Sequence, residues 1–213
     1  MTPAAAMRLG FGLAVLAAAW APGTEAALGG GFAAHMTRHM ALLAVASALI
    51  ALGLAGSRFD PTARAPLLFA AVPASLFELL AVWGWHAPGA HDLARASGLA
   101  FAAEQATFLL AGLWLWLACF GRAGAVDLAR AGQGVLAMLL TSIHMTLFGV
   151  LLATTTRPLY DPALCGGASL LTGQHLGGVI MLLVGGGVYF AAGLTLAARL
   201  LKDDVLVSGD DAR

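Results

Sequence analysis

The chain has 213 residues, of which 60% are hydrophobic and only 10% are charged, and its mean hydropathy is +0.87. Soluble domains carry about 25% charged residues, so this composition indicates an integral membrane protein. The formal net charge is zero, and no basic tract suggests a nucleic-acid partner. Abundant glycine and alanine favour helices that approach closely, and no alternating strand pattern is seen. We therefore expect an all-α, polytopic membrane helix bundle.

The first apolar segment covers residues 9–21, follows Arg8 and is stopped by Pro22-Gly23. It is short for a helix that crosses a bilayer, which needs about 20 residues. A single basic residue, a short apolar core and the small residues at 24–27 are also typical of a cleaved signal peptide. The sequence therefore leaves two interpretations of residues 8–21, a retained first helix and a signal peptide.

Five further apolar segments bring the expected number of transmembrane helices to about six, in one transmembrane domain over residues 1–201. We expect Pro73 to bend the third helix. The polar residues 202–213 are expected to form a loose cytoplasmic tail. The five segments cover approximately residues 32–56, 65–86, 96–120, 127–155 and 171–201.

Basic residues near the helix ends predict the orientation of the bundle. If the N-terminus is cytoplasmic, most of the basic residues lie on that side, and both termini are then expected in the cytoplasm. The cytoplasmic set would be Arg8, Arg58, Arg64, Arg122, Arg130, Arg199, Lys202 and Arg213, against Arg38, Arg95 and Arg157 on the outer side.

His35 and His39 are four residues apart, so they share one face of the second helix. Met36 and Met40 repeat that spacing on the adjacent face. Imidazole and thioether are ligands that suit copper, particularly the cuprous ion. The alternative is that both histidines are interfacial residues, hydrogen-bonded to their neighbours.

With this orientation, all six histidines fall in the outer half of the bundle or in outer loops. The other four are His86 at the end of the third helix, His91 in the loop beyond it, His144 on the fifth helix and His175 near the start of the sixth. Because His91 is expected in a loop, its replacement by alanine should leave metal binding unchanged. The pattern predicts an outward-facing polar pocket between the second, fourth, fifth and sixth helices.

Two acidic residues fall within expected helices, where an ionised side chain is costly. Glu104 is either a structural partner of Arg38 or of a histidine N–H, or an acceptor that orients a ligand imidazole. Glu78 lies deeper, and we expect it to be a neutral, hydrogen-bonded acid. Cys119 and Cys165 are expected near opposite faces of the membrane, too far apart for a disulfide.

Several stretches together resemble the CtaG family of cytochrome c oxidase assembly factors, and the resemblance covers about residues 32–201. In chain order they are Phe32-Ala33-Ala34-His35-Met36-Thr37-Arg38-His39-Met40, Trp85-His86-Ala87-Pro88, Glu104-Gln105-Ala106-Thr107-Phe108, His144-Met145-Thr146-Leu147-Phe148-Gly149, Arg157-Pro158-Leu159-Tyr160 and Gln174-His175-Leu176-Gly177-Gly178-Val179-Ile180-Met181. The resemblance implies a multi-pass protein of the bacterial inner membrane that helps to build the copper centre of an oxidase and is not an enzyme. Its partners would be an oxidase subunit and a periplasmic copper donor.

The chain departs from the family pattern at two places. Gln105 stands where family members usually have histidine, and Gly173 stands where they usually have aspartate, whereas His175 is additional. These departures affect the expected ligand set more than the family.

We expect His35, His39 and His144 to be the core ligands of a copper ion, which would be cuprous, with His175 or a methionine completing the set. The remaining candidates are Met36, Met40, His86 and Met145 as lesser ligands, with Glu104 and Gln174 in support. Two alternatives stay open: a b-type haem protein, with His35 or His39 and His144 as axial ligands, and a metal-free scaffold for oxidase assembly.

Overall fold

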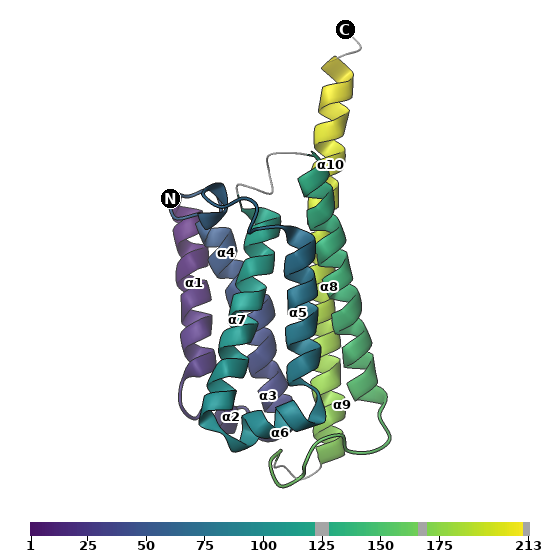
Figure 1. The fold of residues 1–213 in the computed structure, drawn as a ribbon. Helices are drawn as coiled ribbons and strands as arrows, with labels where there is room; N and C mark the ends of the chain where they lie inside the picture. Colours follow the sequence, from purple (N-terminus) through teal and green to yellow (C-terminus); the bar gives the residue numbers. More distant parts are fainter. Residues whose placement is uncertain (122–127, 166–169, 211–213) are drawn as a thin grey trace.

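The computed structural model describes residues 1–121, 128–165 and 170–210, and all regular elements in these ranges are helical. Five of the described helices are long and apolar enough to cross a membrane, and a sixth apolar helix is shorter. They run side by side as one elongated bundle (Figure 1). The expected all-α, polytopic bundle is thus confirmed.

Most of the helices lie close to the expected segments. In chain order the long elements are α1 (Pro3–Trp20); a composite helix made of α3 (Gly31–Met40), the π-helical η1 (Ala41–Ala46) and α4 (Ser47–Leu54); α5 (Ala71–Trp85); α7 (Gly98–Phe120); α8 (Leu128–Thr154); and a second composite of α9 (Leu170–Ile180), the π-helical η4 (Met181–Gly186) and α10 (Gly187–Asp210). The short elements are α2 (Thr24–Ala27), the 3₁₀ turn η2 (Pro61–Ala63) and α6 (Pro88–Ala96).

The third expected helix differs from the prediction at its start. Residues 65–70 are not helical, and α5 begins only at Ala71, so Pro73 lies in the first helical turn. A proline there removes an N–H that has no intrahelical partner in any case. The expected bend at Pro73 was therefore wrong, and α5 is about 22 Å long at 1.5 Å per residue.

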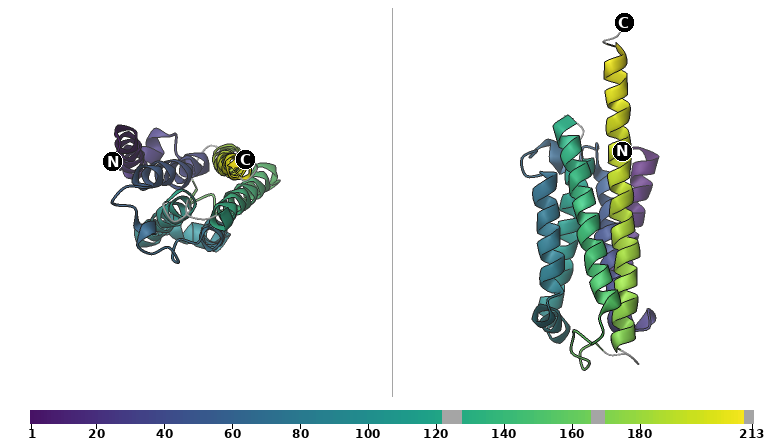
Figure 2. Two further views of the ribbon diagram at one scale, coloured as in Figure 1. Left: turned by 90° about the horizontal axis from the view of Figure 1, so that it is seen from above. Right: turned by 90° about the vertical axis from the view of Figure 1, so that its right-hand side faces the viewer.

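The C-terminal tail also differs from the prediction. α10 continues as a helix to Asp210 instead of ending near Leu201. Figures 1 and 2 show this end of α10 projecting from the bundle beyond the other helices.

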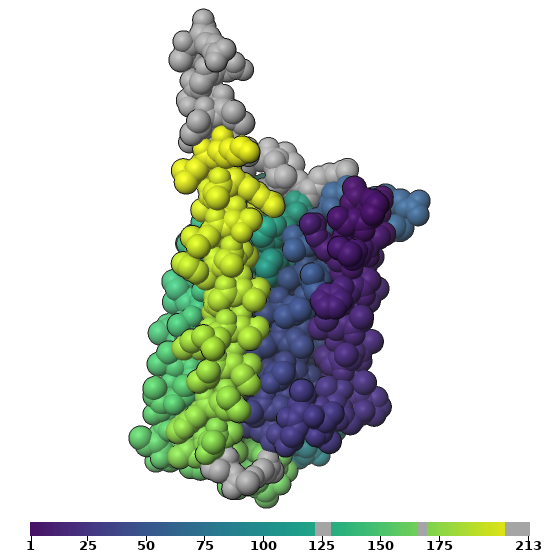
Figure 3. All heavy atoms as spheres, turned by 180° about the vertical axis from the view of Figure 1, so that it is seen from behind, coloured from purple at the N-terminus to yellow at the C-terminus, as the bar shows by residue number. Residues whose placement is uncertain are grey.

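α1 lies at the edge of the bundle, where it packs against α4 through small residues. A Cβ atom on Gly12 would lie 2.9 Å from the backbone nitrogen of Ile50, and one on Gly53 would lie 2.8 Å from that of Leu9. The two backbones can approach this closely only because both positions are glycine. Figure 3 shows α1 at one edge, the α3–α4 composite beside it and the α9–α10 composite next in line.

One end of the bundle is closed by short elements. α2 and α6 lie across it, and we call it the α6 end (Figure 1, bottom). α6 contacts both α5 and α7. Its Pro88 stands at the first helical position, where proline is favoured. Because α6 carries His91 and Arg95, its position brings both side chains to the end of α3 that carries the histidine pair.

Candidate metal centre

His35 and His39 lie on one face of α3, as their spacing predicts. Their ring centroids are 3.9 Å apart, and both side chains are 1% exposed. The His39 ring packs edge-on against Phe108 of α7, at 4.6 Å. The pair is therefore buried between α3 and α7 rather than hydrated at an interface.

Glu104 of α7 completes a compact group with the two histidines. Its Oε1 lies 3.7 Å from His35 Nε2, and its Oε2 lies 3.5 Å from His39 Nε2. One ligand atom from each of the three residues lies within 4.8 Å of the other two. Ligand atoms bound at about 2.1 Å to a tetrahedral ion are about 3.4 Å apart. The spacing thus suits a single metal ion.

Arg95 and Gln105 hold these three side chains in place. Arg95 donates one hydrogen bond to His35 Nδ1 and another to Glu104 Oε2, each at 2.6 Å. The Gln105 amide nitrogen lies 3.0 Å from both Glu104 Oε2 and His39 Nε2. Because His35 Nδ1 accepts from Arg95, a neutral His35 carries its proton on Nε2. An ion could bind Nε2 of a neutral imidazole only after that proton has moved to Nδ1 and the Arg95 hydrogen bond to His35 has broken.

The sequence offered Arg38 or a histidine N–H as a structural partner of Glu104 and did not name Arg95. Arg38 instead lies 3.1 Å from Glu25 and stacks over the Phe101 ring, with Cζ 4.6 Å from the ring centroid. Arg95 also approaches Glu25, at 4.0 Å. The signal for Arg95 was its place among the three outer arginines, nine residues before Glu104. The sequence did not predict that α6 lies across the end of the bundle, which is what brings Arg95 to Glu104.

Several buried donor atoms of the group have no hydrogen-bond partner within the described residues. They are His35 Nε2, His39 Nδ1 and Glu104 Oε1, together with His86 Nε2 nearby. A buried polar atom without a partner costs about 1–3 kcal/mol, so such atoms seldom gather in one place without a reason. A cation bound between His35 Nε2 and Glu104 Oε1, which are 3.7 Å apart, would satisfy both atoms at once.

His86, at the end of α5, has the arrangement typical of a metal ligand. Its Nδ1 lies 2.7 Å from the Val82 carbonyl oxygen, to which it donates, and its ring is edge-on to His39 at 5.5 Å. Ligating histidines usually donate their second ring N–H in this way, which leaves the other nitrogen free to bind. The structure therefore favours His86 more strongly than the sequence did.

His144, the expected third core ligand, is not brought into this group. It is buried on α8, and neither ring nitrogen has a hydrogen-bond partner among the described residues. It is nevertheless not among the residues whose ligand atoms lie within 4.8 Å of one another. Depth along a helix was the basis of its prediction, and depth does not determine which neighbour a side chain faces.

His175 and Gln174 also lie apart from the group. His175 Nε2 is 2.8 Å from the Thr155 carbonyl oxygen, and the buried Gln174 accepts a hydrogen bond from the Leu159 N–H, also at 2.8 Å. Both residues hold the segment between α8 and α9, so the structure gives them a role in positioning that segment.

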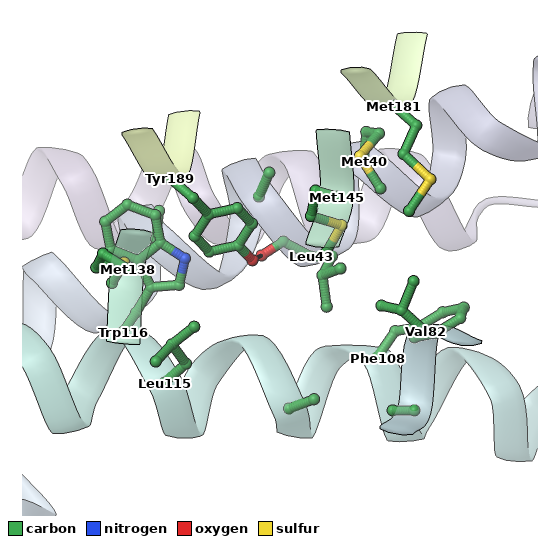
Figure 4. Close-up of a cluster of buried hydrophobic side chains, with 14 of the residues drawn as sticks. Met40, Leu43, Val82, Phe108, Leu115, Trp116, Met138, Met145, Met181 and Tyr189 are labelled. Atoms are coloured by element: carbon green, nitrogen blue, oxygen red, sulfur yellow. Dashed lines mark hydrogen bonds between the residues drawn. The ribbon is translucent and has the colours of Figure 1, made fainter. Parts of the chain in front are cut away.

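The candidate methionines gather on a different side of α3. Figure 4 shows Met40, Met145 and Met181 together at one end of the buried hydrophobic cluster. A Cβ on Gly185 of η4 would lie 3.2 Å from Met40 Sδ, and one on Gly177 of α9 would lie 2.8 Å from Met36 Cγ. The thioethers therefore face α9 and η4, whereas the two histidines face α7.

His91 is not in an open loop, and that expectation was wrong. It lies on α6, is 1% exposed, and packs against the rings of Tyr160 at 4.1 Å and His35 at 5.3 Å. Burial, together with the nearby Arg95 guanidinium, lowers the pKa of His91 to about 4. The imidazole is therefore neutral at pH 7, which is the form that binds metals.

Two further expectations concern buried groups outside the centre. The Tyr189 hydroxyl lies against the Glu78 carboxyl group and 3.1 Å from the Leu43 carbonyl oxygen. The hydroxyl has only one proton, so it can donate to only one of these two neighbours at a time. If it donates to the Leu43 carbonyl oxygen, a protonated Glu78 can donate to the hydroxyl, which fits the neutral, hydrogen-bonded acid expected there. Cys119 and Cys165 are both free.

These observations define a class: a polytopic helical membrane protein with a buried His–His–Glu group near the α6 end. The chain belongs to the family described as cytochrome c oxidase caa3 assembly factor (Caa3_CtaG), whose model matches residues 5–203. The match confirms the resemblance found in the sequence, and it includes most of α1. Comparisons with curated proteins and with solved structures gave no significant match.

Proposed function

We propose that this protein binds copper at the centre formed by His35, His39 and Glu104 and passes it on during maturation of a cytochrome c oxidase copper centre. The observation that carries the proposal is the group of unpartnered donor atoms buried in a chain of this assembly-factor family. Copper is the cargo here, and no catalytic step is assigned to the protein.

The charges around the centre favour a monovalent ion. Glu25 and Glu104 carry two negative charges, and Arg38 and Arg95 carry two positive charges, so these four groups sum to zero. Each extra charge placed in a poorly solvated site costs desolvation energy, and a divalent ion costs more than a monovalent one. Two or three neutral imidazoles with one carboxylate can therefore hold the cuprous ion at lower cost than the cupric ion.

The location of the centre fits exchange with partners outside the cytoplasm. The centre lies at the α6 end, and the distribution of basic residues favours the outer side of a bacterial inner membrane for that end. We propose a periplasmic copper donor and an oxidase subunit as the two partners. Lipid surrounds the apolar outer faces of the helices.

The space beside the histidines favours an ion over a haem. The cavity that His35 lines has a volume of about 50 Å³. Cofactor sites usually measure about 300–1,000 Å³. The haem alternative also requires His144 opposite His35 or His39, and His144 is not among the residues grouped with them.

The proposal is tested in cells whose oxidase depends on this protein, by replacing it with the His39→Ala variant. We expect the purified oxidase to contain at least about tenfold less copper, since loss of a ligand lowers metal affinity more than the 10–100-fold typical of a supporting residue. His175→Ala is the matched control, because His175 lies outside the group, and it should mature the oxidase normally. If cells with the His39→Ala variant produce an oxidase with its full copper content, the copper proposal is wrong and the metal-free scaffold is favoured instead.

A further inference from the structure

A small cavity lies at the α6 end, between the buried centre and the surface. Its volume is about 50 Å³, and its lining includes Phe32, His35, His91, Arg95 and Cys165. One water needs roughly 10–15 Å³ of such space, so the cavity can hold one ion with little solvent. His35 lines this cavity and also belongs to the deeper group, so the two places share a residue.

Two donor atoms that suit a soft metal lie close together at this cavity. Cys165 Sγ lies 3.8 Å from His91 Nδ1. His35 also lines the cavity, and its Nε2 is buried without a hydrogen-bond partner among the described residues. The ligand atoms of Cys165, His91 and His35 do not all lie within 4.8 Å of one another, so the close pair is Cys165 Sγ and His91 Nδ1. With metal–sulfur and metal–nitrogen bonds of about 2.3 and 2.0 Å, a separation of 3.8 Å corresponds to an angle of about 120° at the ion. Such an angle suits a three-coordinate ion, with a water molecule as the third ligand.

The chain between α8 and α9 is fixed so that Cys165 faces the cavity. The Tyr160 hydroxyl donates to the His86 carbonyl oxygen at 3.1 Å, and the Cys165 N–H donates to the Asp161 carbonyl oxygen at 3.1 Å. The Asp161 N–H lies 3.4 Å from a carboxylate oxygen of Asp92 on α6. These bonds attach the segment to α5 and α6, so the thiol position is built into the fold.

A larger opening leads towards this cavity. A cleft of about 340 Å³ is lined by Glu25, Arg38, Arg95 and Leu164. Glu25, Arg95 and Leu164 also line the small cavity. An ion arriving from outside the bundle can therefore reach Cys165 and His91 before it reaches His39.

We propose that Cys165 and His91 form an entry site for the cuprous ion, with His35 as the next ligand inward. The thiol gives up its proton to water as the copper–sulfur bond forms, and it is protonated again when the ion moves on. No change of oxidation state is involved. The ion passes inward by ligand exchange, in which His35 binds first and Cys165 and His91 are then replaced by His39 and Glu104. This inference rests on the proposed function.

Thiolate is the softest ligand on the path, and soft ligands select cuprous copper. Burial, together with the Asp92 carboxylate, raises the pKa of the Cys165 thiol to about 11. The alternative is that Cys165 is only a small buried side chain that donates a weak hydrogen bond to His91.

The test is copper-edge X-ray absorption of the purified, full-length protein loaded with one equivalent of cuprous ion. In the His39→Ala variant the deeper centre is broken, so the ion should stay at the entry site. We expect one sulfur neighbour at about 2.3 Å and nitrogen neighbours at about 2.0 Å. Adding Cys165→Ser should remove the sulfur signal, whereas adding Cys119→Ser, the matched control at the other end of the bundle, should leave it.

Two results would overturn the entry site. One is a copper spectrum of the His39→Ala variant without sulfur, and the other is a sulfur signal that survives Cys165→Ser, which would point to methionine. A kinetic measurement adds a second readout: Cys165→Ser and His91→Gln should load at least tenfold more slowly than the parent, and equal rates would contradict the proposal. A failure of the proposed function would give a different result from a failure of the entry site. In that case His39→Ala and Glu104→Gln would bind cuprous ion as tightly as the parent, while the sulfur signal from Cys165 remained.

Discussion

Arg95 donates to both His35 and Glu104, so one guanidinium fixes two of the three candidate ligands. The Glu104 carboxylate is 1% exposed and the Arg95 side chain is 9% exposed. Removing one partner of a buried ion pair is more costly than removing both, because the remaining charge is left without compensation.

The Arg95→Met variant should therefore lose about 3–5 kcal/mol of stability in metal-free detergent solution. The Arg95→Met/Glu104→Met double variant should lose clearly less than the sum of the two single changes. Thermal unfolding of the four proteins provides the double-mutant cycle. Additive losses would show that the pair does not act as a unit.

At this scale the sequence predicted spacing well and partners poorly. The i, i+4 relation of His35 and His39 is local, so the helix period alone places both rings on one face. The bond from Arg95 to Glu104 depends on α6 folding back over α7, and no local pattern determines that turn. His144 illustrates the same limit, because its depth was predictable but its neighbours were not.

Among the elements, two π-helical turns stand out at the same level of the bundle. η1 follows directly after Met40, and η4 begins at Met181, so both adjoin the methionine cluster of Figure 4. The Ser47 hydroxyl donates to the Leu42 carbonyl oxygen at 2.8 Å, and the Ser142 hydroxyl donates to that of Gly186 at 2.8 Å. Such turns are often found at functional sites. The apolar run of residues 41–56 predicted only a regular helix, because a π turn is stabilised by contacts with other helices.

The α8–α9 contact depends on glycine in a way that one substitution can test. A Cβ on Gly178 would lie 2.5 Å from the backbone nitrogen of Ala153, whereas a Cβ on Gly187 would have no atom within 4 Å. Gly178→Ala should therefore lower the free energy of unfolding by about 1–3 kcal/mol. Gly187→Ala should be neutral or stabilising by up to about 1 kcal/mol, because alanine favours the helix.

Thermal unfolding of both variants in the same detergent, followed by the loss of helix content, compares their stabilities. An equal effect of both substitutions would show that the close approach of α8 and α9 does not exist in the membrane protein.

For the whole molecule, composition and hydropathy were sufficient to predict the class of fold, and the family match agrees. The segment boundaries were correct to within a few residues except at the starts of α1 and α5 and at the end of α10. The late start of α5 has a local cause, since Pro73 is tolerated in a first helical turn. The alternation of the helices predicted all six histidines towards one end of the bundle, and the structure brings His35 and His39 together with Glu104 at the α6 end.

The orientation of the bundle follows from the distribution of basic residues and is tested by fusions to alkaline phosphatase, which is active only outside the cytoplasm. A fusion after Cys165 should be active, and one after Gly124 should be inactive. The reverse pattern would place the centre and the entry cavity on the cytoplasmic side, and a periplasmic copper donor could not reach them.

The most direct test of the central claim is an equilibrium titration of cuprous ion into the solubilised protein against a competing chelator. We expect His39→Ala to weaken binding by about a hundredfold or more and Glu104→Gln by about tenfold or more. His144→Ala, which changes a buried histidine outside the group, should bind within about threefold of the parent, because supporting effects need contact with a ligand. If His39→Ala and Glu104→Gln bind cuprous ion as tightly as the parent, these residues do not form a copper centre.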